Sequence, residues 1–389
     1  EAIAKALDMG AEDEQLLFLP MAHIFAKVLA FAGIRLGYVT AFAEGIPKVV
    51  DNIGEVRPTF MGSVPRIYEK VYTKVVSGAA QAGFPKKQIF EASVAVGAEV
   101  SSERQAGREP AGLLAAKYAV ATKLVFSKLH TLFGGRLRFF ISGGAPLSKD
   151  IAEFFHAAGI LVLEGYGLTE TTAATHVNRL DSYRFGSVGQ ALDGVEVKLA
   201  DDGEICMRGP NILREYWAKP EATAEALDDE GWFHSGDIGE IDEDGFLRIT
   251  DRKKDIIVTA GGKNIAPQNL ENTLKLSPYV SQAMVHGDKR KFLSALVTLD
   301  EEAAAAWAKG AGIQFVDLAD LSQHPKVFEL IQGEIDGMNA DLPSYERIKK
   351  FAILEADLSQ ADGELTPTLK VKRKVVTDRH RSLLDSFYD

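Results

Sequence analysis

Residues 137–171 read LRFFISGGAPLSKDIAEFFHAAGILVLEGYGLTET, and this stretch decides the fold class. It starts with an apolar segment at 137–141, continues with a helical period over 148–158, and returns to an apolar segment at 160–163. Each apolar segment is short and is followed by glycines, as is common for buried strands. A strand, a helix and a second strand in this order predict an α/β fold with a parallel sheet covered by helices.

The same pattern extends toward the N-terminus. Residues 60–63 resemble a strand, and Pro65 opens a helical pattern directly after them. Residues 78–128 contain few turn residues and carry helical periods, which predicts a largely helical insertion. We therefore predict parallel α/β layers over residues 1–170.

Short strands and tight turns follow this region. Asp-Gly pairs supply the positive φ angles that tight hairpins need, and they occur at 193–194, 202–203 and 244–245. They predict an antiparallel, β-rich part over residues 171–250, which completes a large domain of residues 1–250.

The charged run Asp-Arg-Lys-Lys-Asp at 251–255 marks another change of pattern. Runs of this kind are usually solvated turns. Beyond it we predict helices at 267–276, 302–309 and 325–338 and strands at 280–286 and 292–299. The sequence thus predicts a domain boundary and hinge at 251–255, followed by a small mobile α+β domain over residues 256–389.

Composition excludes several classes of protein. The 389 residues include 44 Lys and Arg against 55 Asp and Glu, so the net charge is −11, which argues against a nucleic-acid partner. The single cysteine, Cys206, excludes intramolecular disulfides and fits a reducing, cytoplasmic compartment. No apolar run reaches the ~18–20 residues of a membrane span.

Two glycine-containing segments are candidate ligand sites. Gly143, Gly144 and Ala145 follow a predicted strand at the edge where ligands bind to open α/β sheets, although a plain strand–helix turn would have the same sequence. The segment GYGLTET at 165–171 begins like a dinucleotide fingerprint, but Glu170 stands in place of the third glycine, which excludes a Rossmann NAD site.

The GYGLTET segment offers an aromatic ring, a hydroxyl and a carboxylate within five residues. Tyr166 can stack on a base, Thr169 can hydrogen-bond a phosphate oxygen, and Glu170 can hold Mg²⁺, which prefers oxygen ligands. A core tyrosine followed by a capped helix start is the alternative interpretation.

Further candidates lie downstream, each with an ordinary alternative. Asp237, in the sequence HSGDIG, and Arg252 can bind the hydroxyls of a ribose, but aspartates are frequent in turns. Gly261 and Gly262 form a flexible turn, and Lys370 lies in the basic segment PTLKVKR, which would ordinarily be solvated surface.

Taken together, GYGLTET, HSGDIG and DRKKDIIVTAGGKNIAP resemble the adenylate-forming superfamily, which also contains luciferases and peptide-synthetase adenylation domains. The resemblance runs from Leu19 to about Arg373. It is strongest to bacterial long-chain fatty acyl-CoA synthetases, because of FLPMAH at 18–23, the insertion ending in KLVFSK at 123–128, and YERIKKF at 345–351.

The resemblance implies a role for each candidate residue. Gly143, Gly144 and Ala145 would line the adenine and Tyr166 would stack on it. Thr169 would contact the α-phosphate, and Glu170 would bind Mg²⁺. The remaining implied roles are ribose binding (Asp237, Arg252), the hinge (Lys254), the pantetheine path (Gly261, Gly262) and contact with the carboxylate and α-phosphate during adenylation (Lys370).

The implied activity is that of an ATP-dependent long-chain fatty acid–CoA ligase, with fatty acid, ATP and CoA as substrates. Two alternatives stay open: a fatty acyl-AMP ligase that loads a carrier protein, and a non-catalytic protein that binds nucleotide or acyl groups. The resemblance leaves open the oligomeric state, the acyl chain length and a peripheral contact with a membrane.

One departure from the family pattern concerns the phosphate loop. No segment matches the Ser/Thr/Gly-rich sequence TSGTTGxPKG, and residues 1–10 resemble the middle of an amphipathic helix. We therefore expect a truncated chain that does not complete the reaction alone. We also expect the strands near Phe60 and Leu137 to be incompletely paired, because no strand is predicted before Leu16.

Overall fold

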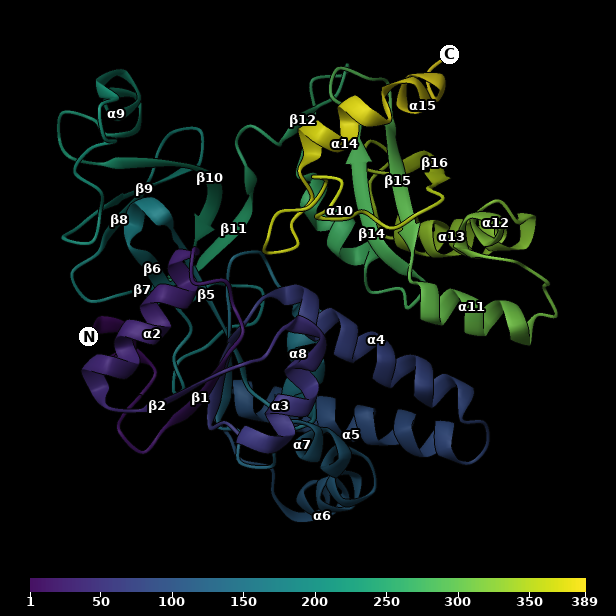
Figure 1. Cartoon of the computed structure of the whole chain (residues 1–389), viewed down its shortest axis with the longest axis horizontal. Helices are drawn as coiled ribbons and strands as arrows, with labels where there is room; N and C mark the ends of the chain where they lie inside the picture. Colours follow the sequence, from purple (N-terminus) through teal and green to yellow (C-terminus); the bar gives the residue numbers. More distant parts are fainter. The chain divides into compact units, whose positions relative to one another are not determined.

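The computed structural model describes all 389 residues, Glu1 to Asp389. The chain divides into two compact units, whose elements are labelled in Figure 1. The first unit comprises Glu1–Tyr68 and Ala79–Ile249, and the second comprises Glu69–Gly78 and Thr250–Asp389. No helix in the structure has both the length and the apolar character that crossing a membrane requires.

A seven-stranded sheet forms the centre of the first unit, in the order β2-β1-β3-β4-β5-β6-β7. The pairs from β2 to β5 are parallel, and β5–β6 and β6–β7 are antiparallel. This confirms the predicted α/β fold. The strands are β1 (Glu14–Leu17), β2 (Val39–Phe42), β3 (Phe60–Ser63), β4 (Phe139–Ser142), β5 (Val162–Leu168), β6 (Ala173–Val177) and β7 (Gln190–Ala191).

The expectation of incompletely paired strands is wrong. Strand β3 lies between β1 and β4, with Gln15 opposite Phe60, and β4 lies between β3 and β5. The sequence conceals β1 because its first two residues, Glu14 and Gln15, are polar, although Gln15 is fully buried. Its amide nitrogen donates hydrogen bonds to the Thr40 hydroxyl at 2.9 Å and to the Leu29 carbonyl at 3.3 Å.

Helices cover both faces of this sheet. Phe139 belongs to a core shared with the helices near the N-terminus, whereas the next residue, Phe140, contacts Tyr68 and Phe133 on the opposite face. Successive strand side chains point to opposite faces, so both faces are apolar. The helices of the first unit are α1 (Ala2–Ala6), α2 (Ile24–Leu36), α3 (Val49–Val56), α5 (Lys86–Gln105), α6 (Gly112–Ala121), α7 (Ser127–Leu132) and α8 (Lys149–Ala157). Helix α4 (Pro65–Gln81) is divided, because its residues Glu69–Gly78 belong to the second unit.

A four-stranded antiparallel sheet follows, in the order β11-β10-β9-β8. Gly194, Gly203 and Gly245 of the predicted turns have φ angles of 88°, 83° and 80°, which confirms the tight turns. Strand β10, which carries Asp237, was not predicted as a strand, because two glycines interrupt its sequence FHSGDIGEI. The elements are β8 (Glu196–Leu199), β9 (Glu204–Arg208), α9 (Pro220–Ala226), β10 (Phe233–Ile241) and β11 (Leu247–Arg252).

The second unit is an α+β fold around a three-stranded sheet in the order β14-β15-β16. The predicted strands and the three predicted helices are present, whereas β16, α12, α14 and α15 were not predicted. The elements are β12 (Ile257–Val258), β13 (Asn264–Ile265), α10 (Pro267–Leu274), β14 (Val280–His286), β15 (Leu293–Leu299), α11 (Glu301–Gly310), α12 (Leu318–Ser322), α13 (Pro325–Ala340), β16 (Ile348–Ile353), α14 (Arg373–Arg379) and α15 (Arg381–Ser386).

Candidate nucleotide site and the second unit

The Gly143–Ala145 segment leaves the carboxyl end of β4 as a tightly held loop. The Gly143 amide donates to the Ser63 carbonyl at 3.1 Å. A Cβ atom at Gly143 would lie 3.2 Å from the Phe25 ring, and Gly144 has a φ angle of 84°. The positive φ angle favours glycine at 144, a side chain at 143 would press against Phe25, and the loop lies where ligands of parallel α/β sheets bind.

The GYGL residues lie within β5, which corrects the expectation that they follow a strand. Up to Glu164, β5 pairs in parallel with β4, and from Gly165 onward it pairs antiparallel with β6. A Cβ atom at Gly167 would lie 1.7 Å from the Ala173 carbonyl oxygen, so only glycine fits there. The glycines thus allow β6 to approach closely and do not end the strand.

Tyr166 and Asp237 come together from β5 and β10, which are 71 residues apart in the chain. The Tyr166 hydroxyl donates to Asp237 Oδ2 at 2.7 Å, and both residues are buried. A hydrogen bond to a carboxylate is stronger than one between neutral groups. This bond fixes the orientation of the carboxylate that the family resemblance assigns to the ribose.

Thr169 and Glu170 lie in the 3₁₀ turn Thr169–Thr171, directly after β5. Thr169 is exposed. Glu170 Oε1 accepts a hydrogen bond from the Tyr216 hydroxyl at 2.9 Å, and the Glu170 carbonyl accepts one from the Leu213 amide at 2.7 Å. The structure contains no group of three or more His, Cys, Asp or Glu side chains that could hold a metal ion. A single carboxylate still suits Mg²⁺ if phosphate oxygens and water complete its coordination.

Glu164 is a residue of this region that sequence reasoning missed. It is buried on β5 beside Ser142 of β4, and its Oε1 accepts a 2.9 Å hydrogen bond from the Leu147 amide. Burial raises the pKa of Glu164 to about 8, and the hydrogen bond from Leu147 partly opposes this shift. The carboxyl group therefore ties the Gly143–Ala145 loop to the strand that carries Tyr166. The sequence signal that could have identified Glu164 is its position directly after the apolar strand residues Val162 and Leu163.

In the second unit, Lys254 lies in a hydrogen-bonded turn after β11. The amides of Asp255 and Ile256 both donate to the Arg252 carbonyl, at 2.9 and 3.1 Å. Asp251, the residue before Arg252, is buried, and its carboxylate accepts a hydrogen bond from the Gln268 amide at 3.2 Å. The turn is thus attached to the start of α10.

Gly261 and Gly262 lie in the turn between the short strands β12 and β13. Gly262 has a φ angle of 74°, and neither a Cβ atom there nor one at Gly261 would meet backbone within 4 Å. The turn is closed by the Thr259 amide, which donates to the Lys263 carbonyl at 3.0 Å. Gly261 and Gly262 therefore add no side chain to this turn.

Lys370 lies at a narrow hairpin. The Thr366 amide donates to the Lys370 carbonyl at 2.8 Å, and the Lys370 amide donates to the Thr366 hydroxyl at 3.0 Å. Leu369, the residue before it, has a φ angle of 62°, in the left-handed region that non-glycine residues rarely adopt. The turn therefore holds the backbone of Lys370 in a defined position.

Arg373 anchors the segment that follows this hairpin. Its guanidinium contacts both carboxylate oxygens of Glu271, at 2.7 and 2.9 Å, and donates to the Val285 carbonyl at 2.8 Å. Bidentate pairs of this kind have a fixed geometry. Since Glu271 is on α10, that helix is attached both to the turn around Lys254 and to the segment that carries Lys370.

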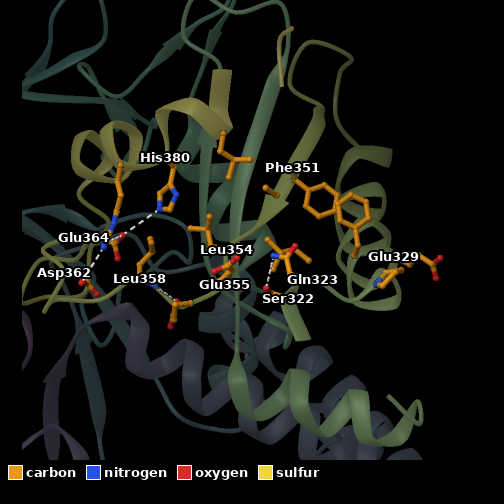
Figure 2. Close-up of a pocket in the computed structure, with 18 residues that line it drawn as sticks. Ser322, Gln323, Glu329, Phe351, Leu354, Glu355, Leu358, Asp362, Glu364 and His380 are labelled. Carbon is orange, nitrogen blue, oxygen red and sulfur yellow. Dashed lines mark hydrogen bonds and ion pairs between the residues drawn. The ribbon is translucent and has the colours of Figure 1, made fainter. Parts of the chain in front are cut away.

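A groove of about 960 Å³ in the second unit contains none of the predicted site residues (Figure 2). Its wall includes the stacked rings of Phe328 and Phe351, whose centroids are 4.4 Å apart, and the ion pair between Glu364 and Arg379 at 2.7 Å. The Glu364 carbonyl also accepts from the Lys372 amide at 2.7 Å. Glu364 therefore connects the wall of this groove to the segment that carries Lys370. The lining of the groove includes no glycine.

The predicted site residues thus fall into two groups. The first unit contains the adenine-loop residues, the Tyr166–Asp237 pair, and the turn with Thr169 and Glu170. The second unit contains Arg252, Lys254, the Gly261–Gly262 turn and Lys370.

Solved structures resemble the chain over nearly its whole length. The adenylation domain of a carboxylate reductase from Mycobacterium chelonae superposes with a TM-score of 0.75 at 23% identity, covering 96% of this chain and 54% of that one. ATP-bound MatB from Rhodopseudomonas palustris gives 0.65 at 24% identity, covering 98% of this chain and 63% of that one. These likenesses establish an adenylation-domain fold.

Curated relatives are more similar in sequence. The long-chain-fatty-acid–CoA ligase FadD15 of Mycobacterium bovis is 40% identical over 378 residues, which cover 96% of this chain and 62% of the relative. ACSBG2 of Rattus norvegicus, also named a long-chain-fatty-acid–CoA ligase, is 35% identical over 100% of this chain and 62% of its own length. The chain thus spans about three fifths of the length of these relatives.

Two family descriptions match the chain directly. The AMP-binding enzyme family matches residues 2–217, and the AMP-binding enzyme C-terminal domain matches residues 254–389. The first match alone covers more than half of the 389 residues. The chain therefore belongs to the family of AMP-binding enzymes.

Proposed function

We propose that this chain supplies the adenosine-binding and CoA-accepting parts of an ATP-dependent long-chain fatty acid–CoA ligase. The observation that carries the proposal is the buried hydrogen bond between Tyr166 and Asp237. It joins the ring that we assign to base stacking to the carboxylate that we assign to ribose binding. The names and identity of the curated relatives support the choice of fatty acid and CoA as substrates.

In the first half-reaction, a fatty carboxylate oxygen attacks the α-phosphorus of ATP. The bond from that phosphorus to the bridging oxygen breaks, so acyl-AMP forms and pyrophosphate leaves. Tyr166 would stack on the adenine, the Gly143–Ala145 loop would line its edge, and Asp237 with Arg252 would hold the ribose. Thr169 would donate to an α-phosphate oxygen.

Two anions must meet in this step, so positive charge near the phosphate is required. Lys370 would place its ammonium against the attacking carboxylate and the α-phosphate. Glu170 would hold Mg²⁺, which neutralises phosphate charge when bound. The hydrogen bond from Tyr216 keeps Glu170 at the end of β5, next to Thr169.

In the second half-reaction, the CoA thiolate attacks the acyl carbonyl carbon and the bond to AMP breaks. Acyl-CoA and AMP are released. The pantetheine arm would pass the turn at Gly261 and Gly262, where neither residue adds a side chain. We propose that residues 251–255 are the hinge, with Lys254 at the position that the family resemblance implies, because hinges absorb backbone changes at few positions.

The adenosine assignment is tested by comparing AMP with its 2′-deoxy and 3′-deoxy forms in calorimetric titrations of the 389-residue chain. The wild type should prefer AMP about tenfold or more, because Asp237 loses a hydroxyl donor with each deoxy form. Asp237→Ala should abolish that preference. Asp228→Ala, a change of an aspartate that the proposal places outside the site, is the matched control. Equal preferences in the wild type and Asp237→Ala would refute the assignment.

A further inference from the structure

One helix of the first unit exposes a row of aliphatic side chains. The helical backbone continues from α6 through the π-helical turn Thr122–Phe126 into α7, at the outer edge of the helical layer (Figure 1). Leu113, Val120 and Leu124 are 72%, 57% and 52% exposed. Their spacing of seven and four residues places them on one side of the helix.

The inward side of the same helix is closely packed. Ala121, Phe126 and Leu129 are buried, and the Phe126 ring lies 6.0 Å from the Tyr118 ring. The exposed aliphatic row is therefore not a loosely packed part of the core. It is a second apolar face that no other part of the first unit covers.

Lysines are interspersed with this aliphatic row. Lys117, Lys123 and Lys128 are exposed. Residues 110–149 contain no aspartate or glutamate at all, although the whole chain has a net charge of −11. The acidic residues just before α6 are already paired, Glu103 with Arg108 at 2.7 Å and Glu109 with Arg104 at 3.5 Å. This helix is thus locally basic on an acidic protein.

We propose that this α6 face, formed by Leu113, Lys117, Val120, Lys123, Leu124 and Lys128, docks on the surface of a membrane that contains anionic lipids. The helix would lie parallel to the surface, with its aliphatic side chains at the boundary between headgroups and acyl chains. The lysine stems would extend alongside, and their ammonium groups would contact lipid phosphates.

The composition of the face favours lipid over a protein partner. Protein interfaces are enriched in aromatic residues and arginine and depleted in lysine, and their strongest contacts are seldom leucine or valine. The α6 face has only leucine, valine and lysine. Helices that lie in a membrane surface combine an apolar face with lysines in the same way.

This docking is independent of the proposed function, because none of its residues belongs to the nucleotide or CoA site. It would nevertheless bring the protein to the place where long-chain fatty acids partition. The attachment is peripheral, which agrees with the finding that no helix is long and apolar enough to cross a membrane.

The test is co-sedimentation of the 389-residue chain with vesicles of phosphatidylcholine, alone or mixed with phosphatidylglycerol. We expect about a hundredfold stronger partitioning to the mixed vesicles, because three lysines contribute about fivefold each. The variant Lys117→Gln, Lys123→Gln, Lys128→Gln should lose about fivefold for each lysine. The variant Leu113→Ser, Val120→Ser, Leu124→Ser should lose tenfold or more.

Two matched controls separate the α6 face from general surface effects. Lys289, Lys309 and Lys326 are exposed lysines of the second unit. Their triple change to Gln should leave partitioning to the mixed vesicles within about twofold of the wild type. Ile34 and Val316 are 82% and 91% exposed, and their change to Ser should have no effect. Far-UV circular dichroism and thermal melting verify that every variant is folded.

A fluorescent probe locates the contact directly. An environment-sensitive dye attached to Val120→Cys should shift to the blue on mixed vesicles, whereas the same dye on Ile34→Cys should not. Equal partitioning to neutral and anionic vesicles, or equal losses in the α6 and control variants, would overturn the proposal. Vesicle-independent association through the α6 face, with no dye shift on lipid, would overturn it in favour of a protein partner.

Discussion

The Tyr166 hydroxyl and Asp237 Oδ2 are joined by a 2.7 Å hydrogen bond between buried side chains of β5 and β10. The two strands belong to different sheets, so this bond connects the parallel sheet to the antiparallel one at the candidate nucleotide site. It also means that the base-stacking and ribose-binding roles proposed for these residues would be coupled. A substitution at either residue should therefore change the orientation of the other side chain.

Tyr166→Phe tests this coupling, because it keeps the ring and removes the donor. We expect AMP affinity to fall about tenfold, since a hydrogen bond to a charged acceptor contributes ~1.5–3 kcal/mol. Isothermal titration with AMP measures the change. Tyr388→Phe, which removes a hydroxyl of the second unit that bonds Ser294 at 2.9 Å, is the matched control. Unchanged AMP affinity in Tyr166→Phe would show that Asp237 is oriented by other contacts.

Glu164→Gln should change how stability depends on pH. Burial raises the pKa of Glu164 to about 8 in the folded protein, above the value of 4.5 expected when it is exposed. The protonated carboxyl therefore contributes stability that is fully present below pH 4.5 and is lost as the pH rises toward 8. Glutamine keeps an acceptor for the Leu147 amide and does not titrate.

Urea unfolding between pH 5 and 8 measures this effect. The free energy of unfolding of the wild type, relative to Glu164→Gln, should fall across this range by an amount on the order of a few kcal/mol. Glu153→Gln, on the exposed side of α8, should show no comparable change. Parallel pH profiles for the wild type and Glu164→Gln would mean that the buried carboxyl is already ionised at neutral pH.

Arg373→Met should loosen the segment that carries Lys370. The change leaves Glu271 buried without its cation, which typically costs ~3–5 kcal/mol. Hydrogen exchange of residues 366–372 should accelerate more than exchange of α13, which is packed elsewhere in the same unit. Arg381→Met breaks the pair of Arg381 with Asp378, and because both residues are exposed its effect should be small. Uniform acceleration throughout the second unit would instead indicate general unfolding.

Lys370→Ala should separate the two half-reactions. Because no segment of this chain matches the phosphate loop, the first half-reaction is assayed in a longer protein that includes such a loop. There, acyl-AMP formation from ATP and a fatty acid should fall by orders of magnitude, because the ammonium no longer neutralises the meeting anions. Conversion of supplied acyl-AMP and CoA should stay within about twofold of the wild type. Lys372→Ala, two residues along the same segment, is the control. A comparable loss in both half-reactions would remove Lys370 from its proposed role in adenylation.

The sequence was sufficient for the parts of the fold where local pattern and long-range packing agree. The segment 137–171 showed β4, α8 and β5, and the Asp-Gly pairs located the turns of the antiparallel sheet. It was insufficient for β1, which begins with the polar residues Glu14 and Gln15, and for β10, where glycines interrupt the pattern.

For the candidate site, the motifs identified individual residues but not their contacts. Nothing local indicates that Tyr166 bonds Asp237, because 71 residues separate them in the chain. Glu164 was missed because its role depends on the Leu147 amide, which only the folded loop brings within 2.9 Å. Hydrogen bonds across sheets are set by topology, and a single sequence does not contain that information directly.

The most direct test of the proposed function supplies palmitoyl-AMP and CoA to the purified 389-residue chain and follows palmitoyl-CoA and AMP by mass spectrometry. In the proposed function, this half-reaction uses the adenosine site, the Gly261–Gly262 turn and the hinge. We predict AMP and palmitoyl-CoA in equal amounts, and a marked loss of both in Asp237→Ala. Palmitoyl-AMP that stays bound without thioester formation, or that acylates a carrier protein but not CoA, would contradict the account.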